Sequence, residues 1–143
     1  MLKILTIAVD FDGTIVENRF PKIGKPILFA IETLKKLQEE GHQLILWTYR
    51  NGPELIEAVE FCNDKGIFFY AVNKSYPEEK FENTISRKIQ ADFFIDDRNI
   101  GGLLGWGEIY QSLSIEFRQK EKLKKIKKEK SERSFLSYFK TKL

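Results

Sequence analysis

The sequence has little of what stabilises a small chain that lacks a hydrophobic core. One cysteine, Cys62, and one histidine, His42, occur in 143 residues, so an intramolecular disulfide and a Cys/His zinc site are both excluded. No apolar run is long enough to cross a membrane, and no GxxxxGK run is present to bind a nucleotide as a P-loop does. We therefore expect a cytoplasmic protein that does not contact a membrane.

Charge is divided unevenly between two parts of the chain. Residues 1–117 hold 13 basic and 18 acidic residues, whereas residues 118–143 hold 11 basic and 3 acidic residues. Hydrophobic residues make up 42% of the chain, and the length of the first part suits one globular domain. The sequence therefore predicts a folded catalytic domain over residues 1–117 and a basic, helical tail over residues 118–143.

The basic tail has three interpretations. A solvated helix that aids solubility is the simplest of them. Electrostatic binding of nucleic acid is the second, and it is not favoured because no recognised nucleic-acid motif accompanies the charge. Packing against the acidic domain is the third. If that domain belongs to a second subunit, the protein is a homo-oligomer.

Strand and helix patterns alternate through the first part of the chain. Unbroken apolar runs predict buried strands over residues 4–9, 42–48, 67–72 and 92–95. Apolar residues at helical spacing predict a helix from Pro26 to Gly41, and Pro53 suits the first turn of a second helix that ends near Lys65. This order predicts an α/β fold, a Rossmann-like three-layer sandwich around a parallel sheet.

Polar residues follow the predicted strands where each strand ends. They are Asp10 and Asp12 after the first strand, Thr48 at the end of the second, and Asp96 and Asp97 after the fourth. The carboxyl ends of parallel strands share one edge, where such sheets bind ligands. Two carboxylates about 4 Å apart repel by about 4 kcal/mol at an effective dielectric of 20, so a cation must lie between them. Oxygen ligands without histidine or cysteine favour Mg²⁺ together with a substrate phosphate.

The order of three short motifs resembles that of a known family. DFDGTI at residues 10–15 resembles the first motif of the haloacid dehalogenase superfamily of phosphohydrolases, WTYR at residues 47–50 the second, and FIDD at residues 94–97 the acidic fourth. The third motif of that superfamily is a lysine, for which Lys88 and Lys74 are the candidates. Lys88 is preferred because its short spacing to the fourth motif is that of small members. The resemblance covers residues 3–110.

The resemblance implies a role for each acidic residue. Asp10 would bind Mg²⁺ and attack phosphorus as the nucleophile, and Asp12 would act as general acid and base while its main-chain carbonyl binds Mg²⁺. Asp96 would bind Mg²⁺ directly. Asp97 would be a second ligand, either directly or through water.

The phosphate contacts are implied in the same way. The hydroxyl of Thr48 and the ammonium of Lys88 would bind the phosphate. Gly13 would let the chain turn where a side chain would obstruct the phosphate. Arg50 and Arg98 lie next to these motifs, and each would either bind an anionic substrate or lie in solvent.

The implied function is hydrolysis of a phosphomonoester, with Mg²⁺, through an aspartyl-phosphate intermediate. A phosphotransferase of the same superfamily and a catalytically silent relative that binds a phosphorylated ligand are the alternatives. Many members carry a cap domain, but residues 15–25 and 73–87 are too few for one. We therefore expect a capless protein with a hairpin flap and a loop, whose open site accepts small molecules or macromolecules as substrates.

Overall fold

The computed structural model describes residues 3–141, except for the side chains of residues 116 and 117. The chain forms two compact units, one up to Gly107 and one from Glu108 onward. The first unit contains β1 (Thr6–Val9), β2 (Val16–Arg19), β3 (Lys22–Pro26), α1 (Ala30–Glu39), β4 (Gln43–Leu46), α2 (Gly52–Asp64), β5 (Ala71–Val72) and β6 (Phe93–Ile95). Two further helices, α3 (Trp106–Leu113) and α4 (Ile115–Lys140), follow along the chain.

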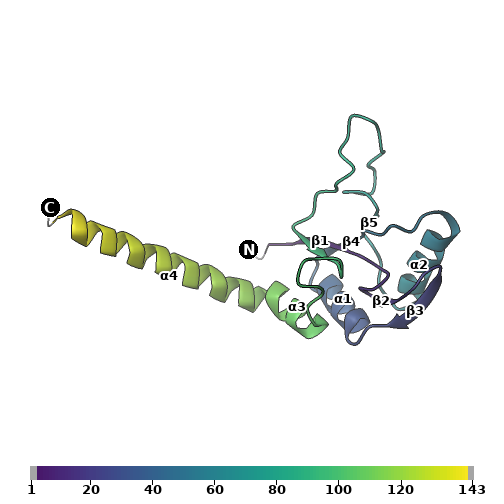
Figure 1. Ribbon diagram of the computed structural model, residues 1–143, viewed down its shortest axis with the longest axis horizontal. Helices are drawn as coiled ribbons and strands as arrows, with labels where there is room; N and C mark the ends of the chain where they lie inside the picture. The colour runs from purple at the N-terminus through teal and green to yellow at the C-terminus, as the bar shows by residue number, and fades with distance from the viewer. Residues whose placement is uncertain (1–2, 142–143) are drawn as a thin grey trace. The chain divides into compact units, whose positions relative to one another are not determined.

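A four-stranded parallel sheet forms the centre of the first unit (Figure 1). The strand order is β5-β4-β1-β6, and every neighbouring pair is parallel. β1 therefore has a partner on each side. Its residues Ile7, Ala8 and Val9 are buried, which explains the unbroken apolar run in the sequence. The predicted α/β class, a parallel sheet flanked by helices, is confirmed.

The third strand is shorter than the sequence predicts. The apolar pattern covers residues 67–72, but only Ala71 and Val72 pair with β4. The amide of Tyr70 still donates to the carbonyl of Leu44 in β4 at 2.7 Å, but the amide of Phe68 donates to Oε1 of Gln38 in α1 at 2.7 Å. A side chain from a distant helix thus takes the place of a strand partner, and sequence periodicity does not report such a contact.

Two helices connect the strands of this sheet. The β1–α1–β4 and β4–α2–β5 connections step the same way along the sheet, so right-handed crossovers place both helices on one face. α1 begins at Ala30 rather than at the predicted Pro26, because Pro26 ends β3 and Phe29 has a left-handed backbone with φ of 65°. α2 begins at Gly52 with Pro53 in its first turn, as predicted.

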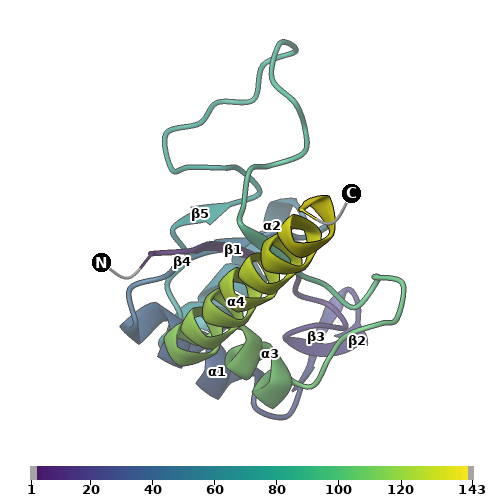
Figure 2. The same ribbon diagram turned by 90° about the vertical axis from the view of Figure 1, so that its left-hand side faces the viewer.

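The opposite face of the sheet is covered by chain without regular structure. The connection from β5 to β6 steps back in the other direction and therefore crosses this face. Its Ile89 packs in a buried cluster with Ala8, Ile45 and Ala71. Residues 73–92 form neither helix nor strand, and part of this connection stands away from the sheet in both views (Figures 1 and 2). The loop predicted in place of a cap domain is thus present.

A hairpin directly follows β1. β2 and β3 pair with each other in an antiparallel, two-stranded sheet that is separate from the main sheet. This hairpin, residues 16–26, corresponds to the predicted flap, and we call it the flap.

The second unit contains the predicted basic tail. α4 is a single helix of 26 residues, so the tail is helical as far as Lys140 (Figure 1). The predicted domain boundary at Phe117 falls inside α4, whereas the compact units divide at Gly107. Over residues 3–141, no helix has both the length and the apolar character of a membrane span.

Candidate functional site

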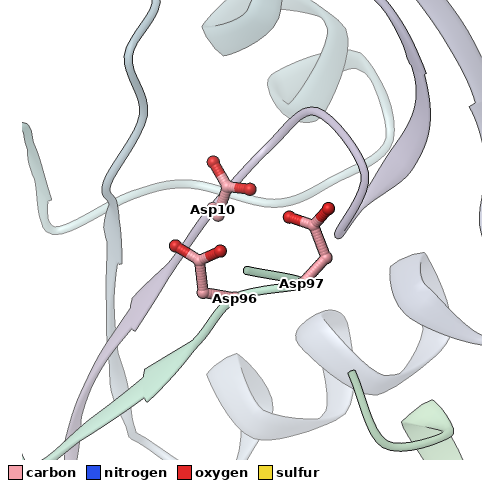
Figure 3. A group of neighbouring side chains, drawn as sticks. All are labelled: Asp10, Asp96 and Asp97. Carbon is pink, nitrogen blue, oxygen red and sulfur yellow. The ribbon is translucent and has the colours of Figure 1, made fainter. Parts of the chain in front are cut away.

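Three carboxylates meet at the carboxyl edge of the sheet. Asp10 follows β1, and Asp96 and Asp97 follow β6 (Figure 3). The parallel pairing of these two strands fixes the meeting, and the amide of Asp10 continues the ladder by donating to the carbonyl of Ile95 at 3.0 Å. One carboxylate oxygen of each aspartate lies within 4.8 Å of the others. The structure thus brings together three of the four aspartates that the sequence predicts as metal ligands, and we call them the acidic cluster.

Burial, with smaller contributions from the neighbouring carboxylates, changes the acidity of Asp10. Its burial, the charge of Asp96 and a hydrogen bond with Asp97 raise the pKa of Asp10 from 3.8 to about 7, although the amide of Phe11 and the hydroxyl of Thr14 act in the opposite direction. Two ionised carboxylates 4.8 Å apart repel by about 3.5 kcal/mol at an effective dielectric of 20. The acidic cluster therefore favours a shared proton or a shared cation.

Thr14 is a buried residue that sequence reasoning missed. Its Oγ1 lies 3.0 Å from Oδ2 of Asp10 and 3.2 Å from Oδ1 of Asp97, and it accepts the amide of Asp97 at 3.1 Å. One hydroxyl thus holds the turn after β1 against the turn after β6. The carbonyl of Thr14 in turn accepts the indole N–H of Trp106 at 3.0 Å. The threonine of DFDGTI is the available signal, but a threonine in a turn has many uses unrelated to a site.

The absence of a side chain at Gly13 matters for two reasons. Its φ of 83° lies in the left-handed region, where a side chain would be strained. A Cβ at this position would also collide with the carboxylate of Asp97, 2.8 Å from its Cγ. The sequence predicts that Gly13 makes room for phosphate, and the structure shows that its missing side chain makes room for Asp97.

The acidic cluster suits a hard divalent cation. Its donors are all carboxylate oxygens, which Mg²⁺ prefers as ligands. The ligands of an octahedral Mg²⁺ lie about 2.9 to 4.2 Å apart, so oxygens within 4.8 Å of one another need to move little to share one ion. The amide of Arg98 donates to Oδ1 of Asp96 at 2.9 Å, which orients that carboxylate and leaves its second oxygen for a ligand.

Asp12, the fourth predicted metal ligand, directs its carboxylate to an arginine. Nε of Arg50 donates to Oδ2 and Nη2 of Arg50 donates to Oδ1, both at 2.7 Å. Such a two-point, charge-assisted pair is strong, and it raises the pKa of Arg50. The carboxylate of Asp12 is therefore not part of the acidic cluster. Metal binding by its main-chain carbonyl stays a prediction.

Arg50 neither binds at an open substrate site nor lies in solvent, the two alternatives that the sequence predicts. It is buried, with 2% of its surface exposed. Besides the pair with Asp12, its Nη1 and Nη2 donate to the carbonyls of Pro21 and Lys22 at 3.0 Å, and Nη1 also donates to the carbonyl of Glu54 at 3.4 Å. All of its N–H donors are used, so Arg50 is neither solvated nor available to bind a substrate. It joins Asp12, the flap and the start of α2.

Thr48 lies in the turn that follows β4. Its Oγ1 accepts the amide of Arg50 at 3.2 Å, so its own O–H remains to donate to a ligand. Asn73 holds this turn, because its Oδ1 accepts the amide of Thr48 at 2.8 Å and its Nδ2 donates to the carbonyl of Arg50 at 3.4 Å. Asn73 has φ of 54°, a conformation that asparagine tolerates. Sequence reasoning missed it, since one asparagine after a strand forms no pattern.

A cavity of about 710 Å³ includes part of the acidic cluster. Its lining residues are Asp10, Asp12, Asn18, Phe20, Trp47, Thr48, Tyr49, Arg50, Asp96 and Arg98. Six residues that the sequence marks as candidates, from three separate segments of the chain, therefore reach one cavity.

Neither candidate lysine lines this cavity. Lys88 is exposed, lines a second cavity of about 780 Å³ with Ser75 and Gln90, and holds its Nζ 6.0 Å from the centre of the Phe94 ring. Lys74 is not among the lining residues of the first cavity either. Both lysines belong to the connection of residues 73–92, whose main chain has no regular structure to direct them.

Comparison with known proteins gives one informative match. No model of a known protein family matches the chain, and no curated protein matches it. Among solved structures, the chain is similar to a conserved protein coded by a locus of Bacteroides thetaiotaomicron. The two sequences are 58% identical, the match covers 78% of this chain and 90% of the other, and the TM-score is 0.73.

The first prediction concerns the buried pair of Arg50 and Asp12. Replacing Arg50→Met leaves the carboxylate of Asp12 and two flap carbonyls without donors, so we expect the free energy of unfolding to fall by about 3 kcal/mol. Urea denaturation measures this change. Arg87→Met, at an exposed arginine, is the matched control and should change stability by less than about 0.5 kcal/mol. Equal effects of the two replacements would contradict the structural role of Arg50.

The second prediction concerns pH in the absence of divalent ions. The native state binds a proton at Asp10 up to about pH 7, whereas an ordinary aspartate, as in the unfolded chain, loses it near pH 3.8. Stability should therefore fall as the pH rises from 4 to 7, because the native state binds more protons than the unfolded state in that range. Thermal unfolding in the presence of a chelator measures this, and Asp10→Asn should make the profile flatter. A wild-type profile as flat as that of Asp10→Asn would contradict the raised pKa.

Proposed function

The chain belongs to the same family as this conserved protein of Bacteroides thetaiotaomicron, and we propose that it is a Mg²⁺-dependent phosphatase that hydrolyses a phosphomonoester through an aspartyl phosphate at Asp10. The proposal includes a more specific fold, a Rossmann-like three-layer sandwich of the haloacid dehalogenase type without a cap domain. The observation that carries the proposal is the acidic cluster at the carboxyl edge of a parallel sheet.

Asp10 is the proposed nucleophile. It directly follows β1, the strand that has a partner on each side, and it lines the cavity. The hydroxyl of Thr14 lies within hydrogen-bond distance of Oδ2, so Oδ1 is the oxygen left to attack phosphorus. Asp10, Asp96 and Asp97 would hold Mg²⁺, which supplies positive charge against the charge of the phosphate. The hydroxyl of Thr48 would donate to a phosphoryl oxygen.

Two displacements complete the reaction. In the first, Oδ1 of Asp10 forms a bond to phosphorus, the bond from phosphorus to the ester oxygen breaks, and Asp12 gives its proton to that oxygen. In the second, Asp12 takes a proton from water, the water oxygen attacks phosphorus, and the bond between Asp10 and phosphorus breaks. One ester and one water become one alcohol and one phosphate.

Arg50 would hold Asp12 in place for both proton transfers. Each oxygen of Asp12 accepts one N–H from Arg50, so each oxygen keeps a further lone pair for a proton. Proton exchange with the substrate therefore does not require the pair to break. The arginine acts through Asp12, and it is a positioning residue rather than a catalytic one.

Lys88 is the proposed cation beside the phosphate, after a change in its side-chain conformation. Its ammonium lies over the ring of Phe94. Phe94 lies two positions before Asp96 in the sequence. The proposal requires the lysine side chain to rotate from this ring toward the acidic cluster.

The third prediction tests the phosphatase directly. We expect purified protein to release phosphate from 4-nitrophenyl phosphate with Mg²⁺ and to lose this activity with a chelator. Asp10→Asn should lower kcat by at least about a thousandfold, because the nucleophile is gone. Asp64→Asn, at an acidic residue of α2 outside the cavity, should leave kcat unchanged.

Other outcomes of this assay separate the alternatives. Release of 4-nitrophenol that is slow in water and rises with added glycerol, with glycerol phosphate in place of free phosphate as the second product, would indicate a phosphotransferase. Binding of inorganic phosphate with Mg²⁺ but no turnover over a broad panel of esters would indicate a silent relative. Full activity of Asp10→Asn would overturn the proposal.

The fourth prediction distinguishes the two lysines. Lys88→Met should lower kcat by about a hundredfold, because a preorganised positive charge at the transferring phosphate is lost. Lys74→Met, on the same connection, should retain wild-type kcat. Steady-state kinetics with Mg²⁺ measures both, and the reverse pattern would assign the role to Lys74.

A further inference from the structure

We propose that the substrate is a phosphomonoester whose leaving group carries a flat ring, and that this ring binds between Phe20 of the flap and Tyr49 of the turn after β4. The inference rests on the proposed phosphatase function and adds to it the class of ester that the site selects. It is carried by the aromatic side chains that line the same cavity as the acidic cluster.

The aromatic side chains of this cavity differ in their burial. Phe20 is 57% exposed, and Tyr49 is fully exposed. Trp47 packs against the buried cluster that contains Ala8 and Ile45, so its position in the cavity is fixed by the core. The exposed rings of Phe20 and Tyr49 contribute little to the core, so their apolar faces remain to cover a ring of a ligand. A cavity of about 710 Å³ is large enough for a phosphate and one such ring.

Phe20 is held at the cavity by a buried cation. The guanidinium of Arg50 lies 5.2 Å from the centre of the Phe20 ring and 5.0 Å from that of Phe11. The same guanidinium binds the carbonyls of the next two residues, Pro21 and Lys22, at 3.0 Å. The flap tip is therefore fixed before a ligand arrives, and little ordering of Phe20 is needed when a ring binds against it.

The fifth prediction compares two esters that differ in the ring alone. Benzyl phosphate and ethyl phosphate both release a primary alcohol, so their intrinsic reactivities are similar. We expect wild-type protein with Mg²⁺ to have the higher kcat/KM for benzyl phosphate. Phe20→Ala should lower kcat/KM about threefold to tenfold for benzyl phosphate and less than twofold for ethyl phosphate.

Two further variants serve as a second test of the ring site and as a control. Tyr49→Ala should show the same selective loss, and because Tyr49 is fully exposed its removal leaves the core intact. Phe81→Ala is the matched control, since Phe81 is 63% exposed and does not line this cavity. It should leave the kcat/KM of both esters unchanged.

Failure of the inference and failure of the proposed function give different results. Turnover of both esters with the same ratio in wild type, Phe20→Ala and Tyr49→Ala would overturn the inference and keep the phosphatase. If neither these two esters nor 4-nitrophenyl phosphate is hydrolysed, the phosphatase is overturned, and calorimetric binding of phenylphosphonate and methylphosphonate with Mg²⁺ then tests the ring site by itself. Tighter binding of phenylphosphonate that is lost in Phe20→Ala would support the ring site, and equal binding of the two would overturn it.

Discussion

Repulsion between carboxylates is the constraint on which the arrangement at the sheet edge depends. The parallel pairing of β1 with β6 brings Asp10, Asp96 and Asp97 within 4.8 Å of one another, whatever their charges. Thr14 offsets part of this cost with one hydroxyl, and Gly13 leaves room for Asp97. Burial of Asp10 adds to the cost, and its pKa is raised to about 7, mainly by burial and to a smaller extent by the charge of Asp96. A divalent cation shared by the three carboxylates would offset this cost, which is why we propose that the acidic cluster holds Mg²⁺.

Arg50 connects this edge to the rest of the cavity. Its single guanidinium binds Asp12, two carbonyls of the flap and the carbonyl of Glu54, and it lies over two aromatic rings. In the proposed chemistry the same contacts orient the proton carrier and place Phe20 at the cavity. Stability, proton transfer and selectivity for the leaving group would then depend on one buried side chain.

The fold and the convergence of the site were open to prediction because they follow from periodicity and topology. An unbroken apolar run marks β1 as an inner strand, and the carboxyl ends of parallel strands share an edge, so Asp10, Thr48 and Asp96 come together. Thr14, Asn73 and the buried position of Arg50 were not predicted, because each depends on hydrogen bonds between segments far apart in the sequence. The short β5 and the position of Lys88 escaped prediction for a related reason, since local pattern does not report which distant group binds a main-chain amide or a side chain.

Binding of Mn²⁺ as a substitute for Mg²⁺ tests the central claim, that the three aspartates of the acidic cluster share one hard ion. Electron paramagnetic resonance of free Mn²⁺ gives the number of sites and their affinity without reference to any activity. The account predicts one tight site in the wild-type protein and at least a tenfold weaker site after Asp96→Asn, with a further loss when Asp97→Asn is added. Unchanged Mn²⁺ affinity in the double variant would contradict it.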